Sequence, residues 1–430
     1  MSGSHEIIGG RPLRGRIRMP GCKGISHRAL VLAALADGRS ELSGLAPGAD
    51  VARTRSALGA LGVAVTDSDS HDVVVVDGRG LNGLIAPGTV IECGNSGTTM
   101  RFFAGLLAGR PFAGVLDGDS SLRSRPMARV IEPLRALGAD ISGSDGGTRA
   151  PLTVRGGRLI GTRVELAVAS GQVKTALTLA GLQAGGVTEI VEPAPSRDHT
   201  ERMLDALGGP VERVDSTTLR VRAGAISSFE LEIPGDPSSA AFFVVAATVV
   251  LGSSIVIEGV ALNPGRIAYL DVLRAMGASI TTTPRGERLG EPVGDIAVEA
   301  APLHGTEIVS REAIVDELPV LAVAAAFAEG ITTISDAREL AVKESDRIAT
   351  VGELLGGLGV GAETQADGLV VRGGRPSAGR FDSHGDHRIA MTAAIAAAAA
   401  TGTSTVGDWD VVSVSYPDFA QDLARLQGER

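Results

Sequence analysis

Four short stretches in the first half of the chain place basic or hydroxyl side chains beside turns that lead into apolar runs. They are residues 20–28, 93–101, 117–127 and 170–174. An apolar run after such a turn predicts a helix, and the start of a helix offers free backbone N–H groups that attract anions. These stretches therefore predict sites for phosphate or carboxylate groups. Each one alone is also compatible with a solvated turn before a core helix.

The second half of the chain adds carboxylates next to further basic residues. Asp316 precedes an apolar helix, Glu344 and Arg347 lie in a run of alternating charge, and Arg388 follows Asp386 and a histidine. Carboxylates beside cations suit general acid–base chemistry. The charged run around Glu344 could instead be a solvated helix face, and residues 386–388 a helix cap. A metal site is not expected, because no second cluster with ligand spacing accompanies Asp386.

The elements that must position these side chains follow from local signals. Residues 15–19 favour a strand, Ser26 is the expected N-cap of the helix that contains residues 29–36, and a second helix is expected to start near Thr98. The chain has 430 residues, 44% hydrophobic and only 3% aromatic, so two domains with aliphatic cores are expected. The apolar runs 240–251 and 389–400 are too short to span a bilayer.

One motif recurs along the whole chain: an amphipathic helix that ends in Leu-Gly or Met-Gly, followed by a strand. Its glycines are Gly62, Gly138, Gly208, Gly277 and Gly359, with a degenerate sixth copy at Gly428, and they lie 69 to 82 residues apart. A glycine in this position is typical of a left-handed helix C-cap. The period predicts six compact strand–helix units, three in each of two similar domains.

Two exits from strands through Pro-Gly, near residues 20 and 235, predict the places where the chain crosses between these domains. One domain would then hold residues 1–20 and 236–430, and the other residues 21–235. The active site is expected in the cleft between them, where closure could exclude water.

Taken together, the motifs resemble the 5-enolpyruvylshikimate-3-phosphate synthase family. The similarity rests on Lys23 with Ser26-His-Arg28, Gly94-Asn-Ser-Gly-Thr with Met100-Arg101, Arg125-Pro-Met, Ser170-Gly-Gln-Val-Lys174, Asp316-Glu, Val342-Lys-Glu-Ser-Asp-Arg347 and Asp386-His-Arg388. The motifs follow the family order over nearly the whole chain. The resemblance implies an α/β fold of two inside-out domains, each of three repeated strand–helix units, joined by two crossings.

The resemblance also implies an activity: transfer of the enolpyruvyl group of phosphoenolpyruvate to the 5-hydroxyl of shikimate-3-phosphate, with release of phosphate. Asp316 would act as base, and Glu344 as acid together with Lys23. The residues implied to bind phosphoenolpyruvate are Lys23, Gly97, Arg101, Arg125, Gln172, Arg347 and Arg388. Those implied to bind the acceptor are Lys23, Gly24, Arg28, Ser170, Gly171, Gln172, Ser196, Arg197, Asp316 and Lys343.

The chain departs from the family pattern at Cys22 and Gly24, which flank the lysine, at Gly171 in place of a second serine, and at Val414. The missing serine at position 24 normally helps to hold the acceptor carboxylate. Two alternatives follow: a related enolpyruvyl transferase with another phosphorylated hydroxyl acceptor, and a non-catalytic ligand-binding relative. An enzyme acting on UDP-N-acetylglucosamine is disfavoured, because it would carry a cysteine where this chain has Ser120.

Composition limits the partners. A net charge of −10 argues against a general nucleic-acid binder, and two cysteines at this spacing suggest thiols in a reducing cytoplasm. The expected partners are the two small substrates, with no nucleic acid, no membrane, no cofactor and no metal, and the expected state is a cytoplasmic monomer.

Overall fold

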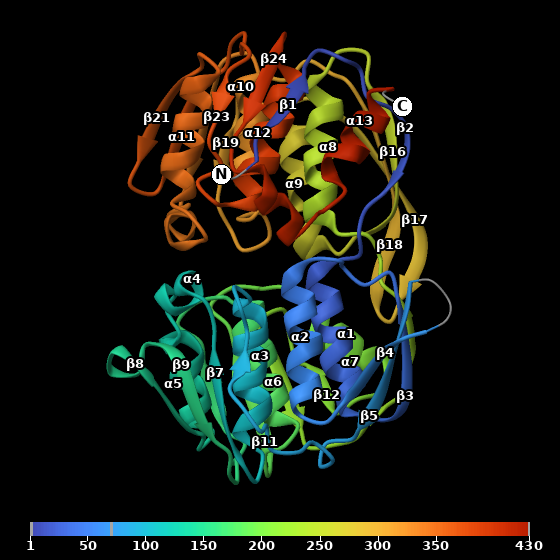
Figure 1. Cartoon of the computed structure of the whole chain (residues 1–430), viewed down its shortest axis with the longest axis vertical. Helices are drawn as coiled ribbons and strands as arrows, with labels where there is room; N and C mark the ends of the chain where they lie inside the picture. The colour runs from blue at the N-terminus through green and yellow to red at the C-terminus, as the bar shows by residue number, and fades with distance from the viewer. Residues whose placement is uncertain (1–2, 69–71, 429–430) are drawn as a thin grey trace. The chain divides into compact units, whose positions relative to one another are not determined.

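The computed structural model describes residues 3–68 and 72–428. The chain divides into two compact units (Figure 1). Unit 1 contains residues 1–20, 234–286 and 292–430, and unit 2 contains residues 21–233 and 287–291. The chain passes between the units at the two Pro-Gly exits. The tip of one hairpin, Glu287–Glu291, also groups with unit 2.

Unit 2 contains helices and strands interspersed along the chain. Its helices are α1 (Lys23–Leu35), α2 (Ala49–Ala60), α3 (Gly97–Ala108), α4 (Ser120–Ser124), α5 (Ala128–Ala136), α6 (Gly171–Gly181) and α7 (His199–Ala206). Its strands are β3 (Ala36–Ser43), β4 (Ala64–Asp67), β5 (Val73–Arg79), β6 (Ile91–Glu92), β7 (Ala113–Asp117), β8 (Asp140–Ser144), β9 (Arg149–Arg155), β10 (Arg163–Glu165), β11 (Val187–Val191), β12 (Val211–Arg213), β13 (Thr218–Arg222), β14 (Ile226–Ser227) and β15 (Glu230–Glu232), with a 3-10 turn at Asp145–Gly147.

Unit 1 repeats this plan. Its helices are α8 (Pro237–Val249), α9 (Pro264–Ala275), α10 (Leu318–Ala326), α11 (Arg347–Gly357), α12 (His387–Ala399) and α13 (Phe419–Leu426), with 3-10 turns at Arg338–Val342 and Trp409–Val414. Its strands are β1 (His5–Ile8), β2 (Arg14–Arg18), β16 (Ser254–Ala261), β17 (Ser279–Arg288), β18 (Glu291–Glu299), β19 (Glu307–Val309), β20 (Ile331–Ser335), β21 (Gly361–Gln365), β22 (Gly368–Arg372), β23 (Arg380–Phe381) and β24 (Thr403–Val406).

The described residues form six sheets, three in each unit. The same order recurs in the sheets β6-β7-β9-β8, β10-β11-β13-β12 and β19-β20-β22-β21, where the first pair is parallel and the other pairs are antiparallel. In β9, inward and outward residues alternate, which places Leu152 and Val154 against the helices. This alternation is typical of a sheet with one buried face.

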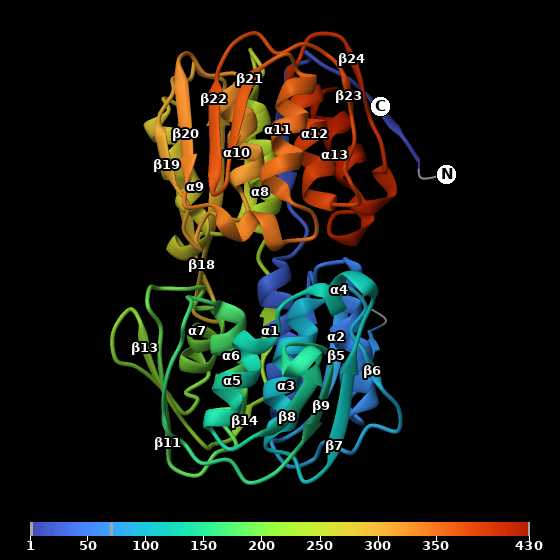
Figure 2. The same ribbon diagram turned by 90° about the vertical axis from the view of Figure 1, so that its left-hand side faces the viewer.

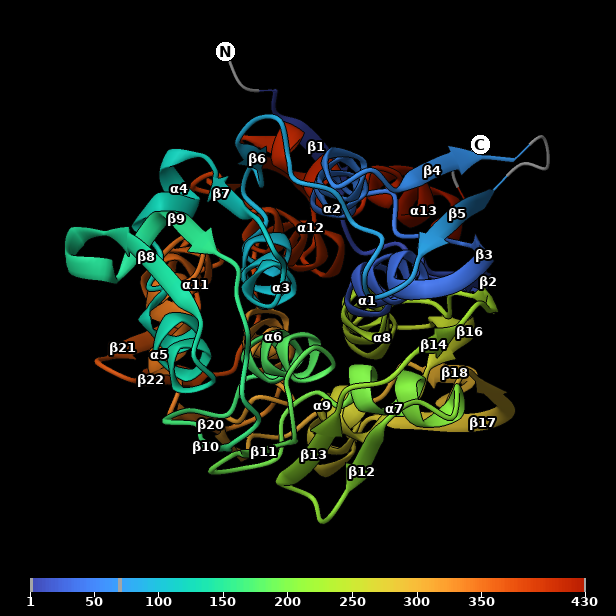
Figure 3. The same ribbon diagram turned by 90° about the horizontal axis from the view of Figure 1, so that it is seen from below.

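Helices fill the centre of each unit and sheets surround them. Nearly every residue of α1, α3 and α6 is buried, and Figure 3 shows these helices gathered inside the strands of unit 2. In unit 1, α8, α10 and α12 take the same place, with β19–β22 on one side and β23 and β24 on another (Figure 2). The expected inside-out α/β fold is confirmed.

The second helix of each repeat ends as the sequence motif predicts. All six glycines, from Gly62 to Gly428, adopt φ between 65° and 105°. This left-handed region is open to glycine without steric cost, and it turns the chain out of the helix. An alanine at Gly277 would also place its Cβ 3.0 Å from the His304 ring, so both conformation and space favour glycine there.

Candidate active site

Lys23 lies in the first turn of α1. The helix begins at Lys23 with Cys22 at its N-cap, so the N-cap expected at Ser26 is wrong. Ser26 lies inside the helix, where its hydroxyl donates to the Cys22 carbonyl at 2.9 Å, the local bond that serine often makes within a helix. The Lys23 ammonium forms an ion pair with Asp50 in the first turn of α2. Asp50 is not among the site residues that the sequence motifs predict.

Arg28 is 4% exposed and holds three helices together. Its Nε donates to Thr200 Oγ1 at 2.7 Å, Nη1 to the Gly24 carbonyl at 2.9 Å, and Nη2 to the Gly171 carbonyl at 3.1 Å and Thr175 Oγ1 at 3.0 Å. Burial lowers its pKa to about 10, so it stays charged at neutral pH. Four of five guanidinium N–H groups are thus used within unit 2.

The turn before α3 brings two predicted arginines to one glycine. A Cβ on Gly97 would lie 3.1 Å from Arg101 Nη1 and 3.6 Å from Arg125 Nη1. The Ser96 hydroxyl accepts from the Thr99 N–H at 3.2 Å and caps the helix. Two guanidinium groups and the positive end of a helix dipole therefore meet beside a residue without a side chain, which suits a phosphate or carboxylate group.

Side-chain amides orient both of these arginines. Arg101 Nη1 donates to Gln172 Oε1, and Gln172 Nε2 donates to Thr98 Oγ1 at 2.8 Å. Arg125 Nη2 donates to Asn95 Oδ1 at 2.5 Å. Gln172 was predicted for its own contact with phosphoenolpyruvate. Its position on α6 also links that helix to the Gly97 turn.

The phosphate motif at α6 has a physical reason for the glycine at position 171 in place of a second serine. Ser170 caps α6, and its hydroxyl accepts from the Val173 N–H at 3.4 Å. A Cβ on Gly171 would lie 2.9 Å from both the Cβ and the carbonyl oxygen of Arg197, which leaves no room for a serine. The Ser196 hydroxyl is buried, and it has no hydrogen-bond partner among residues 3–68 and 72–428.

The Lys174 ammonium serves the fold and does not contribute a charge to the predicted phosphate site. It is buried between Glu192 Oε2 at 2.7 Å and Glu201 Oε1 at 2.8 Å. Two carboxylates already compensate its charge, so the expectation that this amine suits a phosphate is wrong.

A chain of buried hydrogen bonds connects α1, α2 and the start of α3. His27 Nδ1 lies 2.7 Å from Thr54 Oγ1, which lies 2.8 Å from Thr99 Oγ1, and that hydroxyl donates to Ser96 Oγ at 2.8 Å. Burial lowers the pKa of His27 to about 3, so the ring is neutral at pH 7. The chain joins α1, α2 and the cap of α3, and thereby fixes Lys23 and Gly97 on one framework.

In unit 1, Asp316 lies among three cations. Its carboxylate oxygens are 3.6 Å from Lys343 Nζ, 3.8 Å from Arg347 Nη1 and 3.7 Å from Arg388 Nη2. Arg388 Nη1 also donates to the Asp316 carbonyl at 3.1 Å. These cations stabilise the negative charge of Asp316.

Arg347 is 1% exposed, so it does not belong to a solvated helix face. Its Nε lies 2.8 Å from Asp386 Oδ2, and its Nη2 donates to Glu344 Oε2 at 2.7 Å. Burial raises the pKa of Asp386, but the charge and hydrogen bonds of Arg347 act against it and the net shift is downward. Asp386, which is missing from the predicted site residues, is therefore the main support of Arg347.

Asp386 is also the cap of α12, as one interpretation of residues 386–388 predicted. Its Oδ1 accepts from the Arg388 N–H at 2.9 Å. Within the described ranges, no group of three or more His, Cys, Asp or Glu side chains is placed to hold a metal ion.

The predicted residues thus form two sets, one in each unit. The unit 2 set gathers at the N-termini of α1, α3 and α6, and the unit 1 set at the N-termini of α10, α11 and α12. These six helices are the buried central helices of the two units or helices that lie beside them. Their dipoles add positive potential to the basic side chains.

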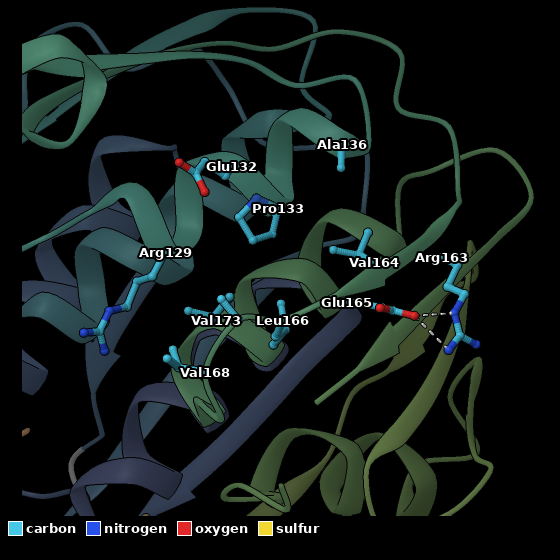
Figure 4. A pocket seen from close by; sticks show the side chains of 11 residues that line it. Arg129, Glu132, Pro133, Ala136, Arg163, Val164, Glu165, Leu166, Val168 and Val173 are labelled. Carbon is cyan, nitrogen blue, oxygen red and sulfur yellow. Dashed lines mark hydrogen bonds and ion pairs between the residues drawn. The ribbon is translucent and has the colours of Figure 1, made fainter. Parts of the chain in front are cut away.

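A pocket of about 300 Å³ lies elsewhere in unit 2, between α5, β10 and the start of α6 (Figure 4). Pro133, Leu166 and Val173 line its apolar part, and Arg163 on its rim lies 3.1 Å from Glu165. None of the predicted site residues lines this pocket, and its paired rim charges do not suit a multiply charged anion.

The comparisons with known proteins agree with these observations. A family model described as EPSP synthase (3-phosphoshikimate 1-carboxyvinyltransferase) matches residues 7–423. A protein of that name from Gloeobacter violaceus is 50% identical over 434 residues, which covers 99% of this chain and 100% of the relative. The chain belongs to the EPSP synthase family. A second relative of that name, from Synechococcus sp. (strain RCC307), is 47% identical and covers 99% of both chains.

The solved EPSP synthase of Acinetobacter baumannii has the same fold. It superimposes with a TM-score of 0.87 at 36% identity and covers 98% of this chain and 97% of its own. The family and fold predicted from the sequence motifs are therefore confirmed. Among the described residues, no helix is both long and apolar enough to cross a membrane.

Proposed function

We propose that this chain is a 3-phosphoshikimate 1-carboxyvinyltransferase. It would transfer the enolpyruvyl group of phosphoenolpyruvate to the 5-hydroxyl of shikimate-3-phosphate and release phosphate. The observation that carries the proposal is the environment of Asp316, a carboxylate among Lys343, Arg347 and Arg388 at helix N-termini. This is the expected setting for a base that works beside two anionic substrates. The relatives that carry the family name support the substrate pair.

The reaction divides into addition and elimination. Asp316 takes the proton of the attacking hydroxyl, the oxygen bonds to C2 of phosphoenolpyruvate, and Glu344, together with Lys23, gives a proton to C3. In the second step C3 loses a proton, the C2–C3 double bond re-forms, and the C2–O bond to phosphate breaks. Basic groups hold the phosphate throughout, and their fixed charges lower the barrier.

Phosphoenolpyruvate would be bound by Lys23, Gly97, Arg101, Arg125, Gln172, Arg347 and Arg388. The acceptor would be bound by Lys23, Gly24, Arg28, Ser170, Gly171, Gln172, Ser196, Arg197, Asp316 and Lys343. The Ser196 hydroxyl, which has no partner in the described part of the chain, suits the acceptor phosphate. Arg28 offers its charge and one N–H, since its other donors serve the fold.

We further propose that residues 1–20 and 236–430 and residues 21–235 act as the two domains, with the substrates in a cleft between them. The protein would work as a cytoplasmic monomer without cofactor, metal, nucleic acid or membrane.

A steady-state phosphate-release assay tests this function. Phosphate should appear only when phosphoenolpyruvate and shikimate-3-phosphate are both present, and UDP-N-acetylglucosamine should not replace the acceptor. Release with another phosphorylated hydroxyl compound alone would favour a related transferase. Binding of both ligands without release would favour the non-catalytic alternative.

Ligand binding should make the protein more compact. Basic groups in both units need an anion to offset their repulsion, so both ligands together should favour a closed arrangement. Small-angle scattering is expected to show a smaller radius of gyration with both ligands than with neither. Profiles that coincide would contradict this prediction.

Glyphosate, the family's inhibitor at the phosphoenolpyruvate site, should compete with phosphoenolpyruvate, and Gly97→Ala should weaken it. The added methyl would lie 3.1 Å from Arg101 Nη1, which must move by a few tenths of an ångström, so glyphosate should bind severalfold more weakly. Inhibition constants of the parent, Gly97→Ala and Gly59→Ala make the comparison. The control has no atom within 4 Å of its added methyl and should match the parent.

A further inference from the structure

Two parallel links join α1 to α2, one helical turn apart. In the first turn of each helix, Lys23 forms an ion pair with Asp50. Four residues further along both helices, His27 Nδ1 lies 2.7 Å from Thr54 Oγ1. Residues four apart lie on the same face of a helix, so both links connect the same two faces. The pair of links therefore sets how α1, and with it Lys23, is placed against α2.

The second link continues into the turn that precedes α3. Thr54 Oγ1 lies 2.8 Å from Thr99 Oγ1, and the Thr99 hydroxyl donates to Ser96 Oγ at 2.8 Å. Ser96 Oγ also accepts from the Thr99 N–H at 3.2 Å and so caps the helix. All members of this chain of hydrogen bonds are at most 1% exposed. Because Ser96 directly precedes Gly97, the chain of hydrogen bonds ends at the turn that two predicted arginines flank.

The number of hydroxyl hydrogens fixes the direction of every bond. A threonine hydroxyl has one hydrogen to donate. The hydrogen of Thr99 goes to Ser96, so the hydrogen between the two threonines must come from Thr54. Thr54 then has none left for His27, and the donor between them must be the Nδ1–H of the ring. His27 therefore carries a hydrogen on Nδ1.

The surroundings of the ring favour the neutral form with this single hydrogen. Burial lowers the pKa of His27 to about 3, so the ring is neutral at pH 7. The Asp50 carboxylate acts against this shift, and the charges of Lys23 and Arg28 act with it. The ring Nε2 has no hydrogen-bond partner within the described part of the chain. A hydrogen on Nε2 would therefore be a buried, unpaired donor, which is costly, whereas a bare Nε2 leaves only one acceptor unused.

We propose that His27 is a positioning residue for the phosphoenolpyruvate site: its Nδ1–H is the first donor in the chain of hydrogen bonds that holds the Gly97 turn in place relative to Lys23. The inference rests on the proposed function, which assigns Gly97 and Lys23 to phosphoenolpyruvate. His27 is fully buried, so it acts on the substrate only through the threonines and the helix cap.

The effect of His27 should fall mainly on one substrate. Arg28 ties the acceptor residues together through bonds to Thr200, Gly171 and Thr175, and His27 takes no part in these bonds. Loss of the Nδ1 donor leaves them in place but removes the second link between α1 and α2. KM for phosphoenolpyruvate should therefore rise more than KM for shikimate-3-phosphate.

Asparagine and glutamine at position 27 make a matched pair of variants. The asparagine amide reaches about as far as Nδ1 of the parent ring and can donate to Thr54, whereas the glutamine amide reaches about as far as Nε2. In steady-state phosphate-release assays, His27→Asn should stay close to the parent. His27→Gln and His27→Leu should raise KM for phosphoenolpyruvate by about threefold to tenfold, the value of one hydrogen bond, and leave KM for shikimate-3-phosphate nearly unchanged.

Three outcomes of these assays would overturn the proposal. One is an equal rise in both KM values. Another is a His27→Asn variant that behaves no better than His27→Gln. The third is a lower kcat with both KM values unchanged, because a purely structural role would only reduce the fraction of folded protein.

A double-mutant cycle tests whether His27 acts through the threonines. Thr99→Val removes the hydroxyl that bonds to Ser96 and keeps a side chain of similar shape. In this background His27→Leu should raise KM for phosphoenolpyruvate much less than in the parent, because the chain of hydrogen bonds is already broken. Effects that multiply independently would contradict the proposal. If His27→Leu does not fold, His27→Gln takes its place in the cycle.

The position of the ring hydrogen can be read directly from protein labelled with ¹⁵N in its histidine rings. Long-range ¹H–¹⁵N spectra should show one ring, absent from the spectrum of His27→Asn, with a protonated Nδ1 and a bare Nε2. Because the pKa is about 3, this ring should not titrate between about pH 5.5 and 8. A hydrogen on Nε2 would overturn the proposal. The spectrum needs no substrate, so it still tests the donor if the parent releases no phosphate, a result that would refute the proposed function itself.

Discussion

Glu344→Gln and Asp316→Asn are each expected to lower turnover by roughly 10²–10⁴-fold, the contribution of a positioned general acid or base. Both amides keep the size of the carboxylate but cannot exchange a proton with the substrate. Asp316 lies near Lys343, Arg347 and Arg388, and Glu344 accepts from Arg347 at 2.7 Å. Both amides leave Arg347 and Arg388 in place and keep an oxygen that can accept from them, so KM for phosphoenolpyruvate should change much less than kcat.

Glu353→Gln is the matched control for these variants. This carboxylate lies on α11, the helix that begins at Arg347, but it is exposed and pairs with His384 at 2.8 Å. The control should keep parental turnover. Near-normal turnover of Glu344→Gln or Asp316→Asn would remove that residue from its proposed role.

The second large effect is expected on stability. Asp386→Ala leaves the buried guanidinium of Arg347 without its main partner, and loss of one member of a buried ion pair costs about 3–5 kcal/mol. Denaturant unfolding at pH 7 should show this loss in the free energy of unfolding. KM for phosphoenolpyruvate should rise as well, because Arg347 would lose its orientation.

The pH dependence gives this prediction a second test. The net pKa of Asp386 is lowered in the folded protein, so its contribution is complete above the unfolded value near 3.9 and is lost as pH falls through the folded value. The stability difference between the parent and Asp386→Asn should therefore be full at pH 7 and shrink below about pH 4. A difference that stays constant down to pH 2 would contradict the assignment.

Local signals predicted the repeated architecture well. The six Leu-Gly or Met-Gly ends appear in the sequence because a left-handed C-cap needs glycine, and all six have the expected positive φ. Such signals depend on neighbouring residues only. The family motifs predicted the inside-out α/β fold, and the structural comparison confirms it.

Contacts between distant segments decided what the sequence did not predict. Ser26 resembles an N-cap, but it lies inside the helix, where its hydroxyl accepts from the Ala46 N–H at 3.0 Å, 20 residues away. Asp50 meets Lys23 across 27 residues and Asp386 meets Arg347 across 39, which no local pattern indicates. The position of Lys174 in the motif indicates a phosphate ligand, but its ammonium forms ion pairs with Glu192 and Glu201.

Product analysis in deuterium oxide tests the central claim most directly. The parent protein is incubated with phosphoenolpyruvate and shikimate-3-phosphate, and ³¹P and ¹H NMR follow the mixture. We expect inorganic phosphate and an enol ether at the 5-hydroxyl in equal amounts, with deuterium in its methylene group because C3 is protonated from the protein before elimination. Consumption of phosphoenolpyruvate without this ether, or no consumption by a folded protein that binds both ligands, would contradict the account.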